Sequence, residues 1–147
     1  MTVGTYTLCI ELTAPTTIEI GALGTECFPA GAYAYTGSAF GSGGFGRVDR
    51  HYELAAGERD VRHWHIDYLL GHDSASIRGD VRTVDADIEC QVANALPDAS
   101  VDGFGASDCD CSSHLAYDED SPRLREMVAS AHRNVDPNAD TDPHRIS

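Results

Sequence analysis

Alternating apolar and polar residues near the start of the chain predict a β-strand followed by its hairpin partner. In residues 4–12, Tyr6, Leu8 and Ile10 occupy every second position, the spacing that places side chains on one face of a strand. An Ala-Pro-Thr turn follows, and residues 17–21 (TIEIG) resume the alternation. We therefore expect these two segments to pair as an antiparallel hairpin.

Two later segments alternate in the same way. Tyr33 and Tyr35 give a third strand its aromatic positions, and residues 75–85 have the pattern of a fourth strand that is interrupted at Gly79. These strands are separated by a glycine-rich loop and by segments with helical spacing.

The glycine-rich loop contains Gly41-x-Gly43-x-x-Gly46, a literal match to the dinucleotide-binding fingerprint. That fingerprint also needs an acidic residue at the end of a second strand about 20 residues further on. Here the residue in that position is Asp67, which lies in a segment with helical spacing. The sequence therefore favours a flexible glycine loop over a nicotinamide or flavin site.

Apolar residues spaced three and four apart predict helices in the remaining segments. The predicted helices span residues 47–55, 63–72, 88–96 and 121–133. The last of them opens with Ser121 as a cap and Pro122 at the first helical position.

The order of these segments predicts an α+β fold with a small mixed sheet of three to four strands flanked by helices. A chain of 147 residues can bury most of its apolar surface as one domain, which we place at residues 1–133. Residues 134–147 are acidic, contain proline and have few apolar groups, a composition typical of a disordered tail.

The composition also bears on the compartment. No apolar run approaches the roughly 20 residues that span a bilayer, and the start of the chain lacks a basic segment followed by an apolar one. Five cysteines are scattered in an odd number, which favours reduced thiols over a disulfide framework. We expect a cytoplasmic protein with no membrane partner.

The charge of the chain indicates adaptation to high salt. The formal net charge is −14, and all ten basic residues are arginine, with no lysine. Self-repulsion on such a surface matters little where the Debye length shrinks to about 3 Å at 1 M salt. We expect a high-salt cytoplasm, the alternative being an ordinary acidic protein that avoids polyanions. In a high-salt cytoplasm, net acidity says little about whether DNA or RNA is a ligand.

A cysteine-rich segment near residue 110 has the residue types of a metal site. Cys109-x-Cys111-x-x-His114 supplies three zinc ligands within six residues, and Cys90 is a candidate for the fourth. The alternative is a tight loop of reduced thiols in which His114 is hydrogen-bonded to the backbone. Both interpretations stay open.

A second histidine cluster lies in the predicted helix at residues 63–72. His63 and Asp67 are four residues apart on one face, whereas His65 lies on another. The pair fits a metal shell, an active-site dyad or a helix-stabilising contact next to Trp64 as a core anchor. Three further histidines are expected at the surface: His72, His132 and His144.

Two tyrosine triplets connect several of these segments. Gly4-Thr5-Tyr6 lies on the first strand and Tyr35-Thr36-Gly37 on the third, with Arg47 in the helix that follows. This arrangement resembles the GIY-YIG nucleases. It is closer to an uncharacterised prokaryotic branch of domains related to those nucleases, which are sometimes fused to endonuclease III.

Five short stretches carry the resemblance to that branch. They are YAYTGSA, RHY, HWHIDYLL, EC and GFGASDCDCSSHL, and together they cover roughly residues 4–117. Their order and spacing make the resemblance more specific than any one of them. It implies a GIY-YIG-like fold and an endonuclease or phosphodiesterase that acts on DNA or RNA with Mg²⁺ or Mn²⁺. The fusion to endonuclease III also indicates a DNA-repair protein as a candidate partner.

The residue types at the implied site suit this chemistry. Arg47 can bind a non-bridging phosphoryl oxygen, and Glu89 can hold Mg²⁺ whose other ligands are water. The resemblance implies that Tyr6 and Tyr35 polarise or deprotonate a water molecule. His51, whose ordinary pKa is nearest neutrality, is the natural auxiliary acid or base.

Other functions fit the same residues. One is a non-catalytic module of this fold that binds nucleic acid or protein and uses the cysteine loop structurally. The middle residue of both triplets favours it, since threonine stands where the family name has isoleucine. Another is a thiol- or zinc-dependent hydrolase centred on Cys109 and His114.

The candidate residues also have plain structural interpretations. Tyr6 and Tyr35 can be half-buried strand residues with satisfied hydroxyls. Arg47 can be a solvated helix residue, and Glu89 can be a charge in the first turn that favours the helix dipole.

Overall fold

The computed structural model describes most of the chain in separate segments. The described residues are 3–19, 24–40, 44–57, 65–72, 74–85, 87–96, 114–135 and 141–144. The strands are β1 (Gly4–Leu12), β2 (Thr16–Glu19), β3 (Thr25–Phe28), β4 (Gly31–Ser38), β5 (Ala75–Val84), β6 (Leu115–Asp118) and β7 (Thr141–His144). The helices are α1 (Gly46–Ala55), α2 (His65–Leu70), α3 (Glu89–Asn94) and α4 (Ser121–Val135).

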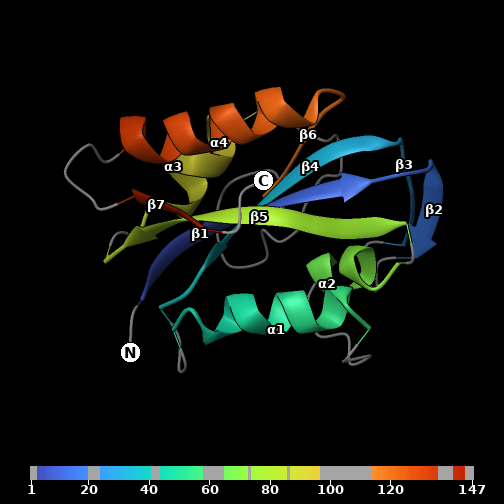
Figure 1. Ribbon diagram of the computed structural model, residues 1–147, viewed down its shortest axis with the longest axis horizontal. Helices are drawn as coiled ribbons and strands as arrows, with labels where there is room; N and C mark the ends of the chain where they lie inside the picture. Colours follow the sequence, from blue (N-terminus) through green and yellow to red (C-terminus); the bar gives the residue numbers. More distant parts are fainter. Residues whose placement is uncertain are drawn as a thin grey trace.

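These elements form an α+β fold, which confirms the predicted class (Figure 1). The main sheet has the order β6-β4-β1-β5-β7, so the four-stranded part has the expected size and β7 adds one strand at its edge. Every pairing in this sheet is antiparallel, where a mixed sheet was expected.

The predicted hairpin between residues 4–12 and residues 17–21 is wrong. β2 pairs with β3 in a separate two-stranded sheet, and β1 lies between β4 and β5. The reason is length and burial. The nine residues of β1 are almost all buried, so both strand edges need long partners for their backbone groups, and β2 offers only four residues.

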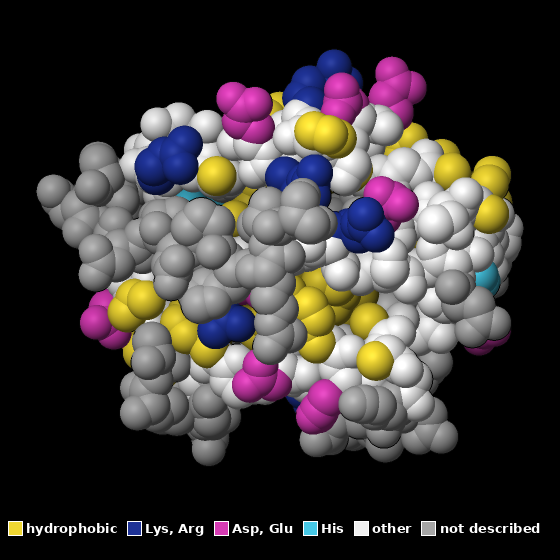
Figure 2. Space-filling view, in the orientation of Figure 1, with side chains coloured by type: hydrophobic (Ala, Val, Ile, Leu, Met, Phe, Trp, Pro, Cys, Tyr) yellow, Lys and Arg dark blue, Asp and Glu magenta, His cyan; other side chains and the backbone are white. Residues whose placement is uncertain are grey.

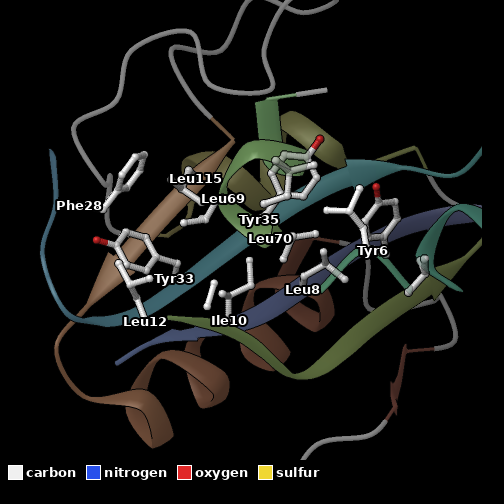
Figure 3. Packing of buried hydrophobic residues seen from close by; sticks show 14 of the residues in the cluster. Tyr6, Leu8, Ile10, Leu12, Phe28, Tyr33, Tyr35, Leu69, Leu70 and Leu115 are labelled. Carbon is white, nitrogen blue, oxygen red and sulfur yellow. The ribbon is translucent and has the colours of Figure 1, made fainter. Parts of the chain in front are cut away.

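The period of two along β1 divides the core between the two faces of the sheet. Tyr6, Leu8, Ile10 and Leu12 pack with α1 and α2 on one face, where Figure 3 shows them in a row along the strand. Cys9 lies on the other face, which α3 and α4 cover (Figure 1). Burial raises the pKa of its thiol to about 12, so Cys9 stays protonated at neutral pH.

The ends of two predicted segments are only partly described. The helix expected at residues 63–72 is described as α2, and Trp64 and His63 lie outside the described residues. Most of the predicted tail, residues 134–147, also lies outside them, and its described parts are the last residues of α4 and the strand β7. Among the described residues, no helix combines the length and the apolar composition needed to cross a membrane.

Candidate active site

The pairing of β1 with β4 brings the two tyrosine triplets together. Tyr6 pairs with Gly37 and Leu8 pairs with Tyr35, so both tyrosines lie on the same face of the sheet. Their ring centroids are 6.3 Å apart. Figure 3 shows the two hydroxyl groups pointing to the same side. The structure therefore places the two triplets on adjacent strands with their tyrosines in contact.

The glycines of the triplets make room for this arrangement. A Cβ atom on Gly37 would lie 2.5 Å from the Tyr6 hydroxyl oxygen, so the Tyr6 ring occupies the space of the missing side chain. Gly4 has a φ of +158°, and a Cβ atom there would collide with the carbonyl oxygen of Thr83 on β5. Both glycines are therefore required by close contacts across the strands.

His51 reaches the tyrosines from α1. Val48, His51 and Leu54 form the buried stripe of that helix. The His51 Nε2 atom lies 2.8 Å from the Tyr6 hydroxyl, and the His51 ring lies 6.1 Å from the Tyr35 ring. Burial, followed by the charges of Arg47 and Arg50, lowers the pKa of His51 to about 3, so its imidazole is neutral.

Arg47 joins the same group of side chains one helical turn before His51. One guanidinium nitrogen, Nη1, donates a hydrogen bond to the Ser38 carbonyl oxygen at 2.7 Å, and the side chain lies close enough to Tyr6 to lower the pKa of its phenol. The Arg47 charge opposes the effect of burial on both phenols, but burial dominates and raises the pKa of Tyr6 and of Tyr35. Both tyrosines are therefore protonated at neutral pH.

Glu89, the first residue of α3, approaches from another side. Its charge raises the pKa of Tyr35 and of Tyr6, which places it within electrostatic reach of both phenols. The Glu89 Oε2 atom lies 3.7 Å from His114 Nδ1, and 21% of the side chain is exposed. The carboxylate thus lies where the buried site meets the surface.

The start of α3 is held by the middle residue of the first triplet. The Ile88 backbone N–H donates a hydrogen bond to Thr5 Oγ1 at 3.1 Å. Thr5 points to the face opposite Tyr6 because neighbouring strand residues alternate. Isoleucine could not accept this bond, so the threonine has a structural use in placing Glu89.

The site lies where β6 stops and β4 continues. β6 pairs with β4 only as far as Tyr35, and the Thr36 N–H then donates to the His114 carbonyl oxygen at 3.0 Å. Beyond that bond, the last residues of β4 have no described strand on this side. Glu89 and His114 meet at this edge, which gives the tyrosine cluster a polar border there.

Asp67 joins the candidate site through partners that we did not expect. Its Oδ1 atom lies 4.0 Å from His51 Nδ1, and its Oδ2 atom lies 3.5 Å from an Arg50 guanidinium nitrogen. We expected Asp67 to pair with His63, which lies outside the described residues. The contact joins two helices at a separation of 16 residues, and the spacing within either helix carries no signal for it.

The described residues do not test the predicted zinc site. Cys109 and Cys111 lie outside them, and Cys90 lies in α3 without a described side chain. In the part of the chain that the structure describes, no three His, Cys, Asp or Glu side chains are grouped as they would be to hold a metal. Glu89 by itself fits Mg²⁺, which commonly binds one or two protein carboxylates and keeps several waters.

His132 corrects the expectation that it lies at the surface. It is fully buried on the side of α4 that faces the sheet, with Nε2 2.8 Å from Thr7 Oγ1 and Nδ1 2.7 Å from Thr83 Oγ1. The signal was present in the sequence, because His132 continues the buried helical stripe of Leu124 and Val128. His72 is half-buried and bonds Thr16, whereas the side chains of His65 and His144 are not described.

Comparison with known proteins gives one match. A protein-family model described as a domain of unknown function, DUF123, matches residues 5–136 and so includes every residue of the candidate site. No curated protein and no solved structure matches the chain. The description of the family names no activity, so any functional conclusion depends on the geometry of the site.

Proposed function

We propose a phosphodiesterase activity for this chain, which belongs to the DUF123 family of domains of unknown function. The proposed enzyme is similar to the GIY-YIG nucleases and hydrolyses DNA or RNA with a divalent metal. One observation carries the proposal: Tyr6 is hydrogen-bonded to His51, beside Tyr35 and within the electrostatic influence of Arg47 and Glu89.

Arg47 supplies the contact to the phosphodiester. Charge develops on the phosphoryl oxygens during hydrolysis, and a guanidinium held in place stabilises that charge without reorganisation. The bond from Arg47 to the Ser38 carbonyl oxygen keeps the guanidinium beside Tyr6. A phosphate bound there would therefore lie next to the phenol that activates the nucleophile.

Tyr6 and His51 together supply the base. Because the pKa of Tyr6 is raised, the phenol keeps its proton at rest and needs an acceptor before its oxygen can act. His51 Nε2 is that acceptor at 2.8 Å. As a water oxygen forms its bond to phosphorus and the ester oxygen leaves, the water proton passes to Tyr6 and the Tyr6 proton passes to His51.

Substrate binding raises the basicity of His51. In the free protein the positive charges of Arg47 and Arg50 contribute to its lowered pKa of about 3. A phosphodiester on Arg47 would compensate one of those charges and so favour protonation of the imidazole. Proton transfer is thereby coupled to the presence of substrate.

Glu89 would hold the metal, with water and the substrate phosphate as the other ligands. Bound Mg²⁺ or Mn²⁺ supplies positive charge that stabilises the oxygens of the reacting phosphate. The partial exposure of Glu89 suits a ligand that must remain reachable by hydrated metal.

A non-catalytic module of the same fold, binding nucleic acid or protein, is the second candidate. Burial favours it, since Tyr6 and His51 each expose only 1% of their surface. On the face that Figure 2 shows, arginines and acidic side chains are intermingled instead of forming a basic patch. Recognition of a phosphate backbone would then depend on the few arginines near the site.

A cleavage assay separates the two candidates. Labelled single-stranded, duplex and branched DNA and RNA are incubated with the protein in multi-molar KCl, with Mg²⁺, with Mn²⁺ and with chelator. If the protein is an enzyme, we expect metal-dependent cleavage. Tyr6→Phe should suppress that cleavage, although it deletes only the hydroxyl. Binding without cleavage of any of these substrates would instead support the module.

A further inference from the structure

We infer that Asp67 is a positioning residue that holds His51 in the tautomer with its proton on Nδ1, so that Nε2 is available to the Tyr6 hydroxyl. The assignment of the tautomer depends on geometry alone. Its consequence for turnover rests on the proposed function.

The two nitrogens of the His51 ring face different chemical groups. Nε2 lies 2.8 Å from the Tyr6 hydroxyl, whereas Nδ1 lies 4.0 Å from Asp67 Oδ1. The side chains of His51 and Asp67 are each only 1% exposed. At 4.0 Å the second contact is too long for a hydrogen bond, so Asp67 acts through its charge.

That charge selects one tautomer. A neutral imidazole has one N–H group and one lone pair, and a carboxylate attracts the N–H and repels the lone pair. Away from water this preference is strong, because the effective dielectric constant is far below that of the solvent. The proton therefore belongs on Nδ1, which leaves the lone pair of Nε2 for the Tyr6 hydroxyl.

Arg50 fixes the carboxylate in this position. Its guanidinium lies 3.5 Å from Asp67 Oδ2, the oxygen that does not face His51. Arg50 directly precedes His51 in α1, so one helical turn carries both the ring and the group that holds its carboxylate. If Asp67 only linked α1 to α2, the contact with Arg50 would be enough. Instead, one carboxylate oxygen of Asp67 faces Arg50 and the other faces His51.

The arrangement gives Asp67 a part in proton transfer. When His51 takes the Tyr6 proton, both ring nitrogens carry hydrogen and the ring becomes positive. Asp67 then stabilises this imidazolium, and it also keeps the ring turned so that Nε2 faces Tyr6 throughout.

Nitrogen NMR of the histidine rings tests the tautomer in the free protein. With ¹⁵N-labelled histidine in multi-molar KCl at neutral pH, wild-type His51 should show a protonated Nδ1 and an unprotonated Nε2. Asp67→Asn, which keeps the shape and removes the charge, should shift His51 toward a mixture of tautomers. Finding the His51 proton on Nε2 in the wild type would overturn the inference, whether or not any variant folds.

Asp80→Asn is the matched control. Asp80 is also a buried carboxylate on the α1 face, but its partners are Tyr52 and Arg82 instead of His51. This variant should leave the His51 tautomer unchanged. An equal effect of Asp80→Asn and Asp67→Asn on His51 would show a general response to lost charge and would overturn the specific role of Asp67.

Kinetics test the catalytic consequence separately. Asp67→Asn should lower kcat by about 100-fold, the lower end of the contribution of a positioned base, with little change in KM. An unchanged kcat in a folded Asp67→Asn protein would contradict the role in turnover. If the wild type cleaves nothing, the proposed function fails, while the NMR result still decides the tautomer.

Discussion

The two faces of the central sheet each bury a histidine, and the surroundings of the two rings differ. On the α1 face, His51 is surrounded by two phenols, two arginines and a carboxylate. On the α4 face, both nitrogens of His132 contact threonine hydroxyls. Burial lowers the pKa of both rings, to about 3 for His51 and about 4 for His132.

The comparison shows that burial of a titratable group does not by itself indicate a functional site. The His132 cluster links α4 to three strands, since Thr7 lies on β1, Thr83 on β5, and Thr36 on β4 is 3.0 Å from Thr7. Its polar atoms satisfy one another and carry no net charge, as expected of a structural connection. The His51 cluster instead concentrates charge beside protonated phenols, which is the arrangement that proton transfer needs.

The largest expected effect is the loss of the fold at low salt, which would disrupt the His51 and the His132 clusters together. The acidic, lysine-free composition leads us to propose that the chain folds cooperatively only at high KCl, so dialysis to about 0.1 M salt should abolish the structure around both histidines. Thermal melts followed by circular dichroism at 3 M and 0.1 M KCl would measure this. Equal stability at the two salt concentrations would contradict it.

On the α1 face, Arg47→Ala should lower turnover by roughly two to three orders of magnitude, the scale for losing one electrostatic contact to the transition state. Stability should change little, because Arg47 is only partly buried. Arg123→Ala is the control, since Arg123 is an exposed residue near the start of α4 that pairs with Asp118 of β6. Similar turnover in the Arg47→Ala and Arg123→Ala variants would contradict a catalytic role for Arg47.

On the α4 face, His132→Leu should lower the free energy of unfolding by about 3 kcal/mol, because buried threonine hydroxyls lose their partner. The folded fraction should keep its kcat, in contrast to His51→Gln. Adding Thr83→Val should recover part of the lost stability by removing one of those hydroxyls. A large loss of kcat in folded His132→Leu would mean that the two faces do not have separate roles.

Gly37→Ala should disturb only the α1 face, since the new methyl group would push against the Tyr6 ring. We expect a loss of about 1–3 kcal/mol in stability, as for other overpacked positions, together with lower turnover. Gly46→Ala is the control because a Cβ there would meet no heavy atom within 4 Å. Comparable melting temperatures for Gly37→Ala and the wild type would contradict the close contact.

Acid should lower the stability of the protein gradually. The folded pKa of both histidines lies below the ordinary value, so the unfolded chain binds more protons below about pH 6.5. Their full contribution to stability is therefore present above pH 6.5 and is lost as the pH falls toward about 4 for His132 and about 3 for His51. Each should contribute about 1.4 kcal/mol per pH unit to the slope.

Denaturant titrations between pH 6.5 and 5 would measure these slopes. His51→Gln and His132→Gln should each reduce the slope by about one proton relative to the wild type. A slope that neither substitution changes would mean that the acid sensitivity comes from the carboxylates instead.

Local patterns in the sequence, together with the family resemblance, were enough to identify much of the fold and several residues of the site. Alternation marked β1, β4 and β5, and helical spacing marked α1, α3 and α4. The resemblance carried by the two triplets, with the spacing of Arg47 and His51, pointed to side chains that the structure does bring together. These signals are local, because the faces of strands and helices follow from the backbone period.

The tertiary structure alone decided which segments became neighbours. β1 pairs with β4 and β5 and not with the nearby β2, because only the longer strands can satisfy the backbone groups along both edges of a buried strand. That choice placed α1 and α4 on opposite faces and so gave His51 and His132 different surroundings. It also brought Asp67 to His51 across two helices. Contacts of this kind depend on packing between distant segments, so the residue spacing within one segment does not predict them.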